Sequence, residues 1–175
     1  AIKYAAHFAL LQKQSYPDRQ PLIYVGRDSR TTGRAMLYSI ISALISVGCD
    51  VTDLGIVSTP TLLLKVQESD ALGGIAITAS HNPPQWNAMK FVDAEGLFLS
   101  PEKAEIFLSS VEKEISWSNW QAIGNISTDN KSIAQHIEKI LAIPYLNIEQ
   151  IRSRRFKVVL DSVNGAGGLI SPRLL

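Results

Sequence analysis

What the sequence lacks excludes several classes of protein. Its 175 residues include a single cysteine, Cys49, so an internal disulfide is impossible, as is usual in a reducing cytoplasm. Its 17 basic and 16 acidic residues nearly balance, leaving a formal net charge of +1. No stretch reaches the roughly 18 consecutive apolar residues that a membrane span needs. We therefore expect a cytoplasmic protein, and the charge balance gives no reason to expect nucleic acid or a membrane as a partner.

Apolar residues make up 46% of the chain, enough for one sizeable core. Short, β-rich apolar runs alternate with stretches whose apolar residues recur at helical spacing. The runs predict strands at 22–26, 50–58 and 71–78, and the stretches predict helices at 2–14, 33–48, 59–69, 101–115 and 129–141.

Strands separated by helices of this length form βαβ crossovers, which predict a mainly parallel sheet covered on both faces. Residues 89–100 instead show two apolar runs around turn residues, which predicts a hairpin and an antiparallel strand. The predicted fold class is α/β: a three-layer α/β/α sandwich with a mixed, mostly parallel sheet.

The chain divides into three parts by composition. Residues 1–146 read as one α/β domain, and residues 147–155 as a polar, charged linker. Residues 156–175 read as a strand, a glycine-rich turn and the first turn of a helix, the truncated start of a second domain. A strand and a helix stub cannot bury a core alone, so we expect the chain to be a fragment.

Two polar loops follow predicted strands at their carboxyl ends, where ligands bind in open α/β sheets. One runs from 26 to 30 and reads GRDSR; the other runs from 78 to 84 and reads TASHNPP. The second places Ser80 beside His81, which raises the possibility of a serine nucleophile.

A serine hydrolase or esterase is one interpretation of Ser80. Its nucleophile turn needs small neighbours in the pattern G-x-S-x-G, whereas Ala79 and His81 flank the serine here. Adjacent side chains also point apart on an extended backbone, so His81 is badly placed as the base.

A phosphoryl carrier is the second interpretation. The Ser80 hydroxyl can hold a phosphoryl group, with His81, Asn82 and Lys90 as hydrogen-bond donors around it. The prolines at 83 and 84 restrict the backbone of the loop. An ordinary capped turn, or an α/β module that binds phosphate without catalysis, stays open on these residues alone.

The glycine-rich turn at 165–168 reads GAGG after a predicted strand. It lacks the G-x-G-x-x-G spacing of a dinucleotide-binding loop, so we interpret it as a tight packing turn.

Four motifs together resemble the α-D-phosphohexomutase family. TASHNPPQWNAMKF (78–91) is similar to its phosphoserine-loop signature, and VGRDSRTTG (25–33) resembles a segment of its first domain. DLGIVSTPT (53–61) and FKVVLDSVNGAGG (156–168) resemble two further segments, in the family's order. Within the family, the sequence is most similar to the bacterial phosphoglucosamine/phosphomannomutase branch.

The resemblance implies an enzyme that moves phosphate between the 6- and 1-positions of a hexose phosphate, with glucosamine, mannose or glucose as the sugar. Ser80 would be the phosphoserine, and a hexose bisphosphate the intermediate. The phosphate on Ser80 would also help to bind Mg²⁺. The oligomeric state is not predicted.

The resemblance also assigns the residues around the serine. His81, Asn82 and Lys90 would surround the phosphoserine, and Lys90 would assist proton transfer to or from the sugar hydroxyl. Arg30, with Asp28, would belong to a supporting loop beneath the site.

The sequence departs from the family pattern in two respects. Ala88 stands where the family commonly has glycine, which puts the path of the loop in doubt. The D-G-D-G-D-R loop that supplies the metal-binding aspartates does not occur, nor does the family's N-terminal segment. We therefore expect residues 1–175 to be inactive alone.

Overall fold

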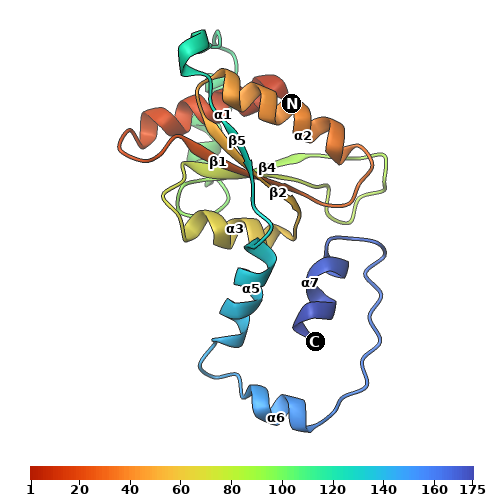
Figure 1. Ribbon diagram of the computed structural model, residues 1–175. Coiled ribbons are helices and arrows are strands. Elements are labelled where there is room, and N and C mark those ends of the chain that lie inside the picture. The colour runs from red at the N-terminus through yellow and green to blue at the C-terminus, as the bar shows by residue number, and fades with distance from the viewer.

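A five-stranded sheet forms the centre of the molecule in the computed structural model, which describes residues 1–175 (Figure 1). Its strand order is β4-β3-β1-β2-β5. β1 pairs in parallel with β2 and β3, β2 pairs in parallel with β5, and β4 alone is antiparallel, beside β3. The strands are β1 (Leu22–Arg27), β2 (Asp50–Ile56), β3 (Gly73–Ile77), β4 (Met89–Val92) and β5 (Ile126–Thr128).

Helices cover both faces of this sheet because its strands present apolar side chains alternately to each side. From β1, Ile23 and Val25 enter the larger core, which α1 and α2 cover with help from Phe107 of α4. Tyr24 enters the smaller core, which α3 covers. The helices are α1 (Ile2–Ser15), α2 (Gly33–Ser46), α3 (Thr59–Gln67), α4 (Pro101–Ser110) and α5 (Ser132–Leu141).

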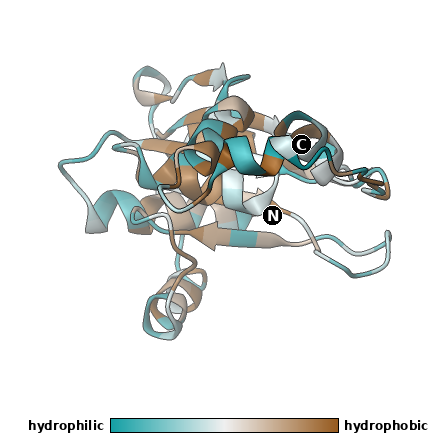
Figure 2. Cartoon of the chain, turned by 90° about the horizontal axis from the view of Figure 1, so that it is seen from below, coloured by the Kyte–Doolittle hydropathy of each residue, from teal (hydrophilic) through white to brown (hydrophobic).

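The layers confirm the predicted α/β/α sandwich with a mixed, mostly parallel sheet. Figure 1 shows α1 and α2 on one side of the sheet and α3 on the other. Figure 2 shows the apolar residues gathered in the central strands, with hydrophilic residues in the outlying loops. No helix combines the length and apolarity that crossing a membrane requires.

Several expected elements differ from the sequence prediction. The hairpin at 89–100 is reduced to β4 and one isolated bridge between Val92 and Phe98. The stretch at 116–127, without a predicted element, contains a 3₁₀ turn, η1 (Trp120–Ala122), and the beginning of β5. β5 exists because β2 offers it an open edge to pair with.

The largest difference lies at the end of the chain. A short helix, α6 (Ile148–Ser153), occupies most of the expected linker. The prediction of a strand from residue 156 is wrong, because residues 156–160 are exposed and form neither helix nor strand. Its apolar residues have no neighbouring strand to pair with, and a lone strand is not stable. The helix that follows, α7 (Gly167–Leu174), is formed and packs on α5. The division into two domains stays a prediction.

Parallel pairing of β1 and β3 determines where the polar loops lie. Arg27 is the register partner of Ile77, so the residues that follow these two strands begin side by side. The backbone N–H of Asp28 donates to the carbonyl of Ile77 at 3.0 Å, which continues the pairing past the strand ends. The fold therefore brings the loops after β1 and β3 to one edge of the sheet.

Candidate functional site

A cleft of about 600 Å³ opens beyond the carboxyl ends of β1 and β3. Its lining comes from residues 28–31 after β1, from the loop after β3, and from a turn just before α7. The first two segments are those predicted to meet at this edge, and the third was not predicted to contribute. All the predicted site residues except Lys90 line the cleft, and Lys90 reaches it through Ser80.

Ser80 is exposed in this cleft and has a left-handed backbone with φ of 54°. Such a conformation costs a residue with a side chain about 1–2 kcal/mol, so neighbouring contacts must stabilise it. The Ser80 backbone N–H donates to the Thr78 hydroxyl at 3.1 Å, and that hydroxyl donates to Asp28 Oδ2 at 2.7 Å. The serine is thereby tied to the end of β1. Strained residues that their surroundings hold in place cluster at active sites and ligand clamps.

Lys90 reaches the serine from β4. Its ammonium Nζ donates to Ser80 Oγ at 2.8 Å. The same nitrogen lies 5.8 Å from the centroid of the Phe98 ring, within range of a cation–π contact. A positive charge at this distance from the hydroxyl would stabilise negative charge that develops on the serine oxygen or on a group attached to it.

Arg30 clamps the loop that carries Ser80. All five N–H donors of its guanidinium have acceptors. Nε donates to Asp28 Oδ2 at 3.0 Å, while the two terminal nitrogens donate to four main-chain carbonyls. These carbonyls belong to Pro83 and Trp86 (2.8 and 3.0 Å, from Nη1) and to Ser80 and Asn82 (2.8 Å each, from Nη2). The predicted support of the Ser80 loop thus takes the form of a charged clamp on its backbone.

His81 and Asn82 are placed differently from one another. His81 is exposed and lines the cleft. Asn82 lines the cleft too, but both its backbone N–H and its side-chain Nδ2 donate to the Ala79 carbonyl at 3.0 Å. In this structure Asn82 therefore closes the turn around Ser80, while His81 faces the space where a ligand would enter.

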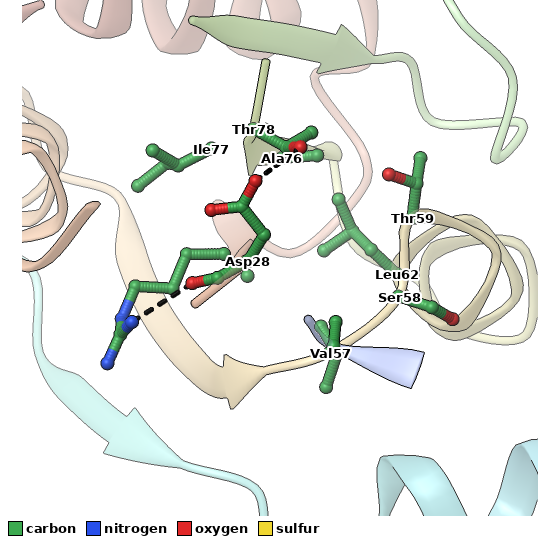
Figure 3. A pocket seen from close by; sticks show the side chains of 11 residues that line it. Asp28, Val57, Ser58, Thr59, Leu62, Ala76, Ile77 and Thr78 are labelled. Atoms are coloured by element: carbon green, nitrogen blue, oxygen red, sulfur yellow. Dashed lines mark hydrogen bonds between the residues drawn. The ribbon is translucent and has the colours of Figure 1, made fainter. Parts of the chain in front are cut away.

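Thr78 lines the cleft, although the sequence reasoning did not single it out. It lies two positions before Ser80, and its hydroxyl joins the Ser80 backbone to the Asp28 carboxylate. Figure 3 shows this bond at the wall of a smaller cavity of about 140 Å³, which lies beside the cleft. A threonine at the carboxyl end of a buried strand, in hydroxyl reach of a neighbouring loop, was the available signal.

Ala88 is compatible with the loop despite the family's preference for glycine there. Its φ is not positive, so no glycine is required by the backbone. Its carbonyl accepts the Thr78 backbone N–H at 3.0 Å and closes the loop at its base.

The residues of this chain do not form a magnesium site by themselves. No group of three or more histidine, cysteine, aspartate or glutamate side chains is close enough together to hold a metal ion. The one carboxylate in the cleft, Asp28, already accepts hydrogen bonds from Thr78 and from the Arg30 side chain and backbone. Mg²⁺ prefers several free oxygen ligands in octahedral geometry, which this arrangement does not supply.

Comparison with known proteins identifies relatives for this arrangement. The family described as "Phosphoglucomutase/phosphomannomutase, alpha/beta/alpha domain I" matches residues 1–116. A "Phosphoglucomutase/phosphomannomutase" of Thermococcus kodakarensis is 38% identical over 100% of this chain and 38% of its own length. A "Phosphoglucosamine mutase" of Methanococcus vannielii is 38% identical over 86% of the chain and 32% of its own length.

Solved structures show the same fold. A phosphoglucomutase/phosphomannomutase family protein from Burkholderia thailandensis superposes on 99% of the chain with a TM-score of 0.73, at 20% identity and 36% of its own length. A putative phosphomannomutase from Thermus thermophilus covers 85% of the chain and 32% of its own length, with a TM-score of 0.68 and 29% identity. The chain spans about a third of the length of the relatives it matches.

The Arg30 clamp gives a first testable prediction. Arg30→Lys replaces five donors in a planar fork with three donors at one point, which cannot reach the same acceptors. Losing about 1.5 kcal/mol of charged hydrogen bonding should raise amide exchange in residues 80–88 roughly tenfold. Hydrogen–deuterium exchange measured by mass spectrometry tests this.

Arg34→Lys is the matched control, because Arg34 is exposed on α2 and its Nε bonds only to the Tyr38 hydroxyl. Unchanged loop exchange in Arg30→Lys, or equal acceleration in both variants, would show that the clamp does not hold the loop.

Proposed function

The chain belongs to the phosphoglucomutase/phosphomannomutase family, and on that premise we propose that it carries the phosphoserine loop of a phosphohexomutase. The complete enzyme would be an intramolecular phosphotransferase that interconverts hexose 6-phosphate and hexose 1-phosphate. Its substrates would be the phosphates of glucosamine, mannose or glucose, with a hexose bisphosphate as intermediate. We place this activity in the cytoplasm.

One observation carries the proposal: the Ser80 hydroxyl receives a hydrogen bond from the Lys90 ammonium in a loop clamped by Arg30. Phosphoryl transfer depends on positioning and on stabilisation of charge more than on covalent chemistry by the protein. A loop with a fixed backbone supplies the positioning, and the ammonium supplies the charge. A phosphate on Ser80 Oγ would lie within reach of Lys90 Nζ and would face the open cleft.

The proposed reaction proceeds in two halves. In the first, the bond between phosphorus and Ser80 Oγ breaks, a bond from phosphorus to a sugar oxygen forms, and Lys90 gives a proton to the departing serine oxygen. In the second, the Ser80 hydroxyl attacks the other phosphate of the bisphosphate and returns its proton to Lys90. The sugar hydroxyl loses a proton in the first half, and the departing sugar oxygen regains one in the second. The resemblance gave the sugar-hydroxyl proton to Lys90, but Lys90 Nζ is hydrogen-bonded to Ser80 Oγ. His81, which lines the cleft, is therefore this chain's candidate to hold the sugar proton, because an imidazole nitrogen can accept and donate one.

Mg²⁺ remains part of the proposal as the cofactor of the complete enzyme. The contribution of this chain would be limited to the phosphate on Ser80, since no other free ligand set exists in it. The steps above use only groups of this chain and of the sugar.

A hydrolase is the second candidate, because a serine bonded to a lysine amine also occurs as a nucleophile and base in acyl transfer. Ser80 would then carry an acyl group instead of a phosphoryl group, with Lys90 as its base. A non-catalytic module that binds phosphate is the third.

Replacement of Ser80 distinguishes these candidates. In the complete gene product, Ser80→Ala should lower mutase turnover with hexose phosphates by at least about a thousandfold, because the phosphoryl carrier is lost. Its melting temperature should stay near that of the wild type, since alanine and serine are equally strained in a left-handed backbone.

Ser109→Ala is the control, because Ser109 is exposed on α4 and bonds only within its helix. Rapid labelling of Ser80 by a fluorophosphonate, without stable phosphorylation, would favour the hydrolase. Full activity of Ser80→Ala would exclude Ser80 as the carrier.

Lys90 should matter for rate rather than for folding. Lys90→Gln keeps a hydrogen bond donor near Ser80 Oγ but removes the proton and the charge, so kcat should fall about a hundredfold. Steady-state kinetics and phosphate content at Ser80 measure the effect. Lys3→Gln, on the exposed start of α1, is the control. A kcat within twofold of the wild type would remove Lys90 from the mechanism.

Residues 1–175 alone should bind hexose phosphates poorly and should show no measurable mutase turnover. The cleft has no metal-ligand group of its own, and the relatives it matches are about three times longer. The test is a mutase assay on the purified 175-residue chain after circular dichroism confirms its helix content. Mutase turnover above background would contradict the expectation that residues 1–175 are inactive alone, while leaving the proposed mutase chemistry in place.

A further inference from the structure

The turn at residues 163–166 lies against the Ser80 cleft although it is remote in sequence from the other two loops. Val163, Gly165 and Ala166 line the cleft, and Ala166 also lines the smaller cavity beside it. This turn belongs to the glycine-rich motif that the sequence suggested to be a packing turn. Its position indicates another use.

Two residues of the turn, Val163 and Asn164, combine a strained backbone with exposed side chains. Val163 and Asn164 have φ of 44° and 56°, in the left-handed region that β-branched residues avoid. Val163 is 83% exposed, so burial of its side chain does not compensate the strain. Instead, Asp161 Oδ1 accepts the Val163 N–H at 2.8 Å, and the Ser162 carbonyl accepts the Gly165 N–H at 2.6 Å. The chain is therefore fixed locally in a shape that packing does not explain.

The fold itself does not require two of the glycines in this motif. The φ angles of Gly167 and Gly168 lie outside the left-handed region. A Cβ on Gly167 would meet nothing nearer than 3.7 Å, and one on Gly168 nothing nearer than 3.6 Å. Gly167 and Gly168 line neither the cleft nor the smaller cavity, so they could carry side chains without narrowing either space. The residues of the motif that do line the cleft are Gly165 and Ala166.

A chain of contacts holds the turn in place. Ile170 of α7 is buried, and α7 packs on α5. α5 in turn is bonded to α3, because His136 Nδ1 hydrogen-bonds the Thr61 hydroxyl at 2.8 Å. Lys139 of α5 also pairs with Glu68 beside the end of α3. Since α3 packs on the sheet, the turn is connected to the body that carries Ser80.

We propose that the 163–166 turn is the substrate-contacting wall of the Ser80 cleft and that Ala166 limits the size of the sugar phosphate that fits there. The reacting hexose phosphate lies between Ser80 and the main chain of Gly165 and Ala166. Ala166 is the specificity-determining position because it lines both the cleft and the adjoining cavity. This inference rests on the proposed mutase function.

The experiment compares Ala166→Leu with Gly168→Leu in the complete gene product. Both variants place a leucine on the same segment, but Gly168 lines neither cavity. Ala166→Leu should raise the KM and the calorimetric Kd for hexose 6-phosphates at least tenfold, and Ala166→Val should fall between it and the wild type. Gly168→Leu should stay within twofold of the wild type. Inhibition by inorganic phosphate, which is smaller than a hexose phosphate, should be unchanged in all three variants.

Each other outcome counts against a specific statement. If Ala166→Leu keeps the KM and Kd of the wild type, the 163–166 turn is not a substrate-contacting wall. Equal loss of hexose phosphate and inorganic phosphate binding, or equal loss in Gly168→Leu, would mean general disruption of the turn and would overturn the proposal too. A lowered melting temperature in Ala166→Leu shifts the comparison to Ala166→Val, which must then show the same selective loss. If the wild-type protein binds hexose 6-phosphates but does not turn them over, the proposed mutase function is refuted. The Kd values of wild type and Ala166→Leu would still decide the role of Ala166.

Discussion

The rest of the site depends on the hydrogen bonds that the Arg30 guanidinium donates. It joins the loop after β1 to the loop after β3, across a sequence separation of 50 or more residues. The parallel pairing of the two strands makes this possible, because it places their carboxyl ends side by side at the same edge of the sheet. Without a charged donor at this point, the main-chain carbonyls of Ser80, Asn82 and Trp86 would have no protein hydrogen-bond partner, and that of Pro83 would keep only the Trp86 N–H. The hydrogen bonds from Arg30 to these carbonyls fix the loop in one backbone conformation.

That shape includes a serine in an unfavourable backbone conformation. A left-handed residue with a side chain costs about 1–2 kcal/mol, while a hydrogen bond to a charged group contributes about 1.5–3 kcal/mol. Several such bonds converge on the loop, so the clamp outweighs the strain at Ser80. The result is a hydroxyl held toward the cleft rather than packed against the sheet, with the Lys90 ammonium beside it.

The sequence predicted the elements with strong periodicity and the residues with distinctive chemistry. β1, β3, α1 and α2 have apolar patterns that depend only on local spacing, and Ser80 and Lys90 occur in a recognisable signature. β5 could not be predicted because its three exposed residues are ordered by β2 alone. The strand at 156 was predicted from the same kind of local pattern and failed for want of a neighbour.

Parts of the site were out of reach for a related reason. The partners of Arg30 are main-chain carbonyls, which every residue carries, so no residue type reveals them. The turn at 163–166 meets the cleft only through the packing of α7 on α5 and of α5 on α3, which is tertiary structure and leaves no local pattern. Thr78 was visible in the sequence, but its importance comes from the position of Asp28 in the loop after β1.

Recognition through main-chain oxygens also bears on how this site can change over evolutionary time. Arg30 hydrogen-bonds Pro83 and Trp86 through their main-chain carbonyls, and Trp86 is 61% exposed. Mutations at such positions can alter the surface presented to a sugar while the carbonyls stay where they are. A lineage could therefore drift from one hexose to another without rebuilding its nucleophile, with conservation concentrated on the arginine and variation permitted in the loop that it holds.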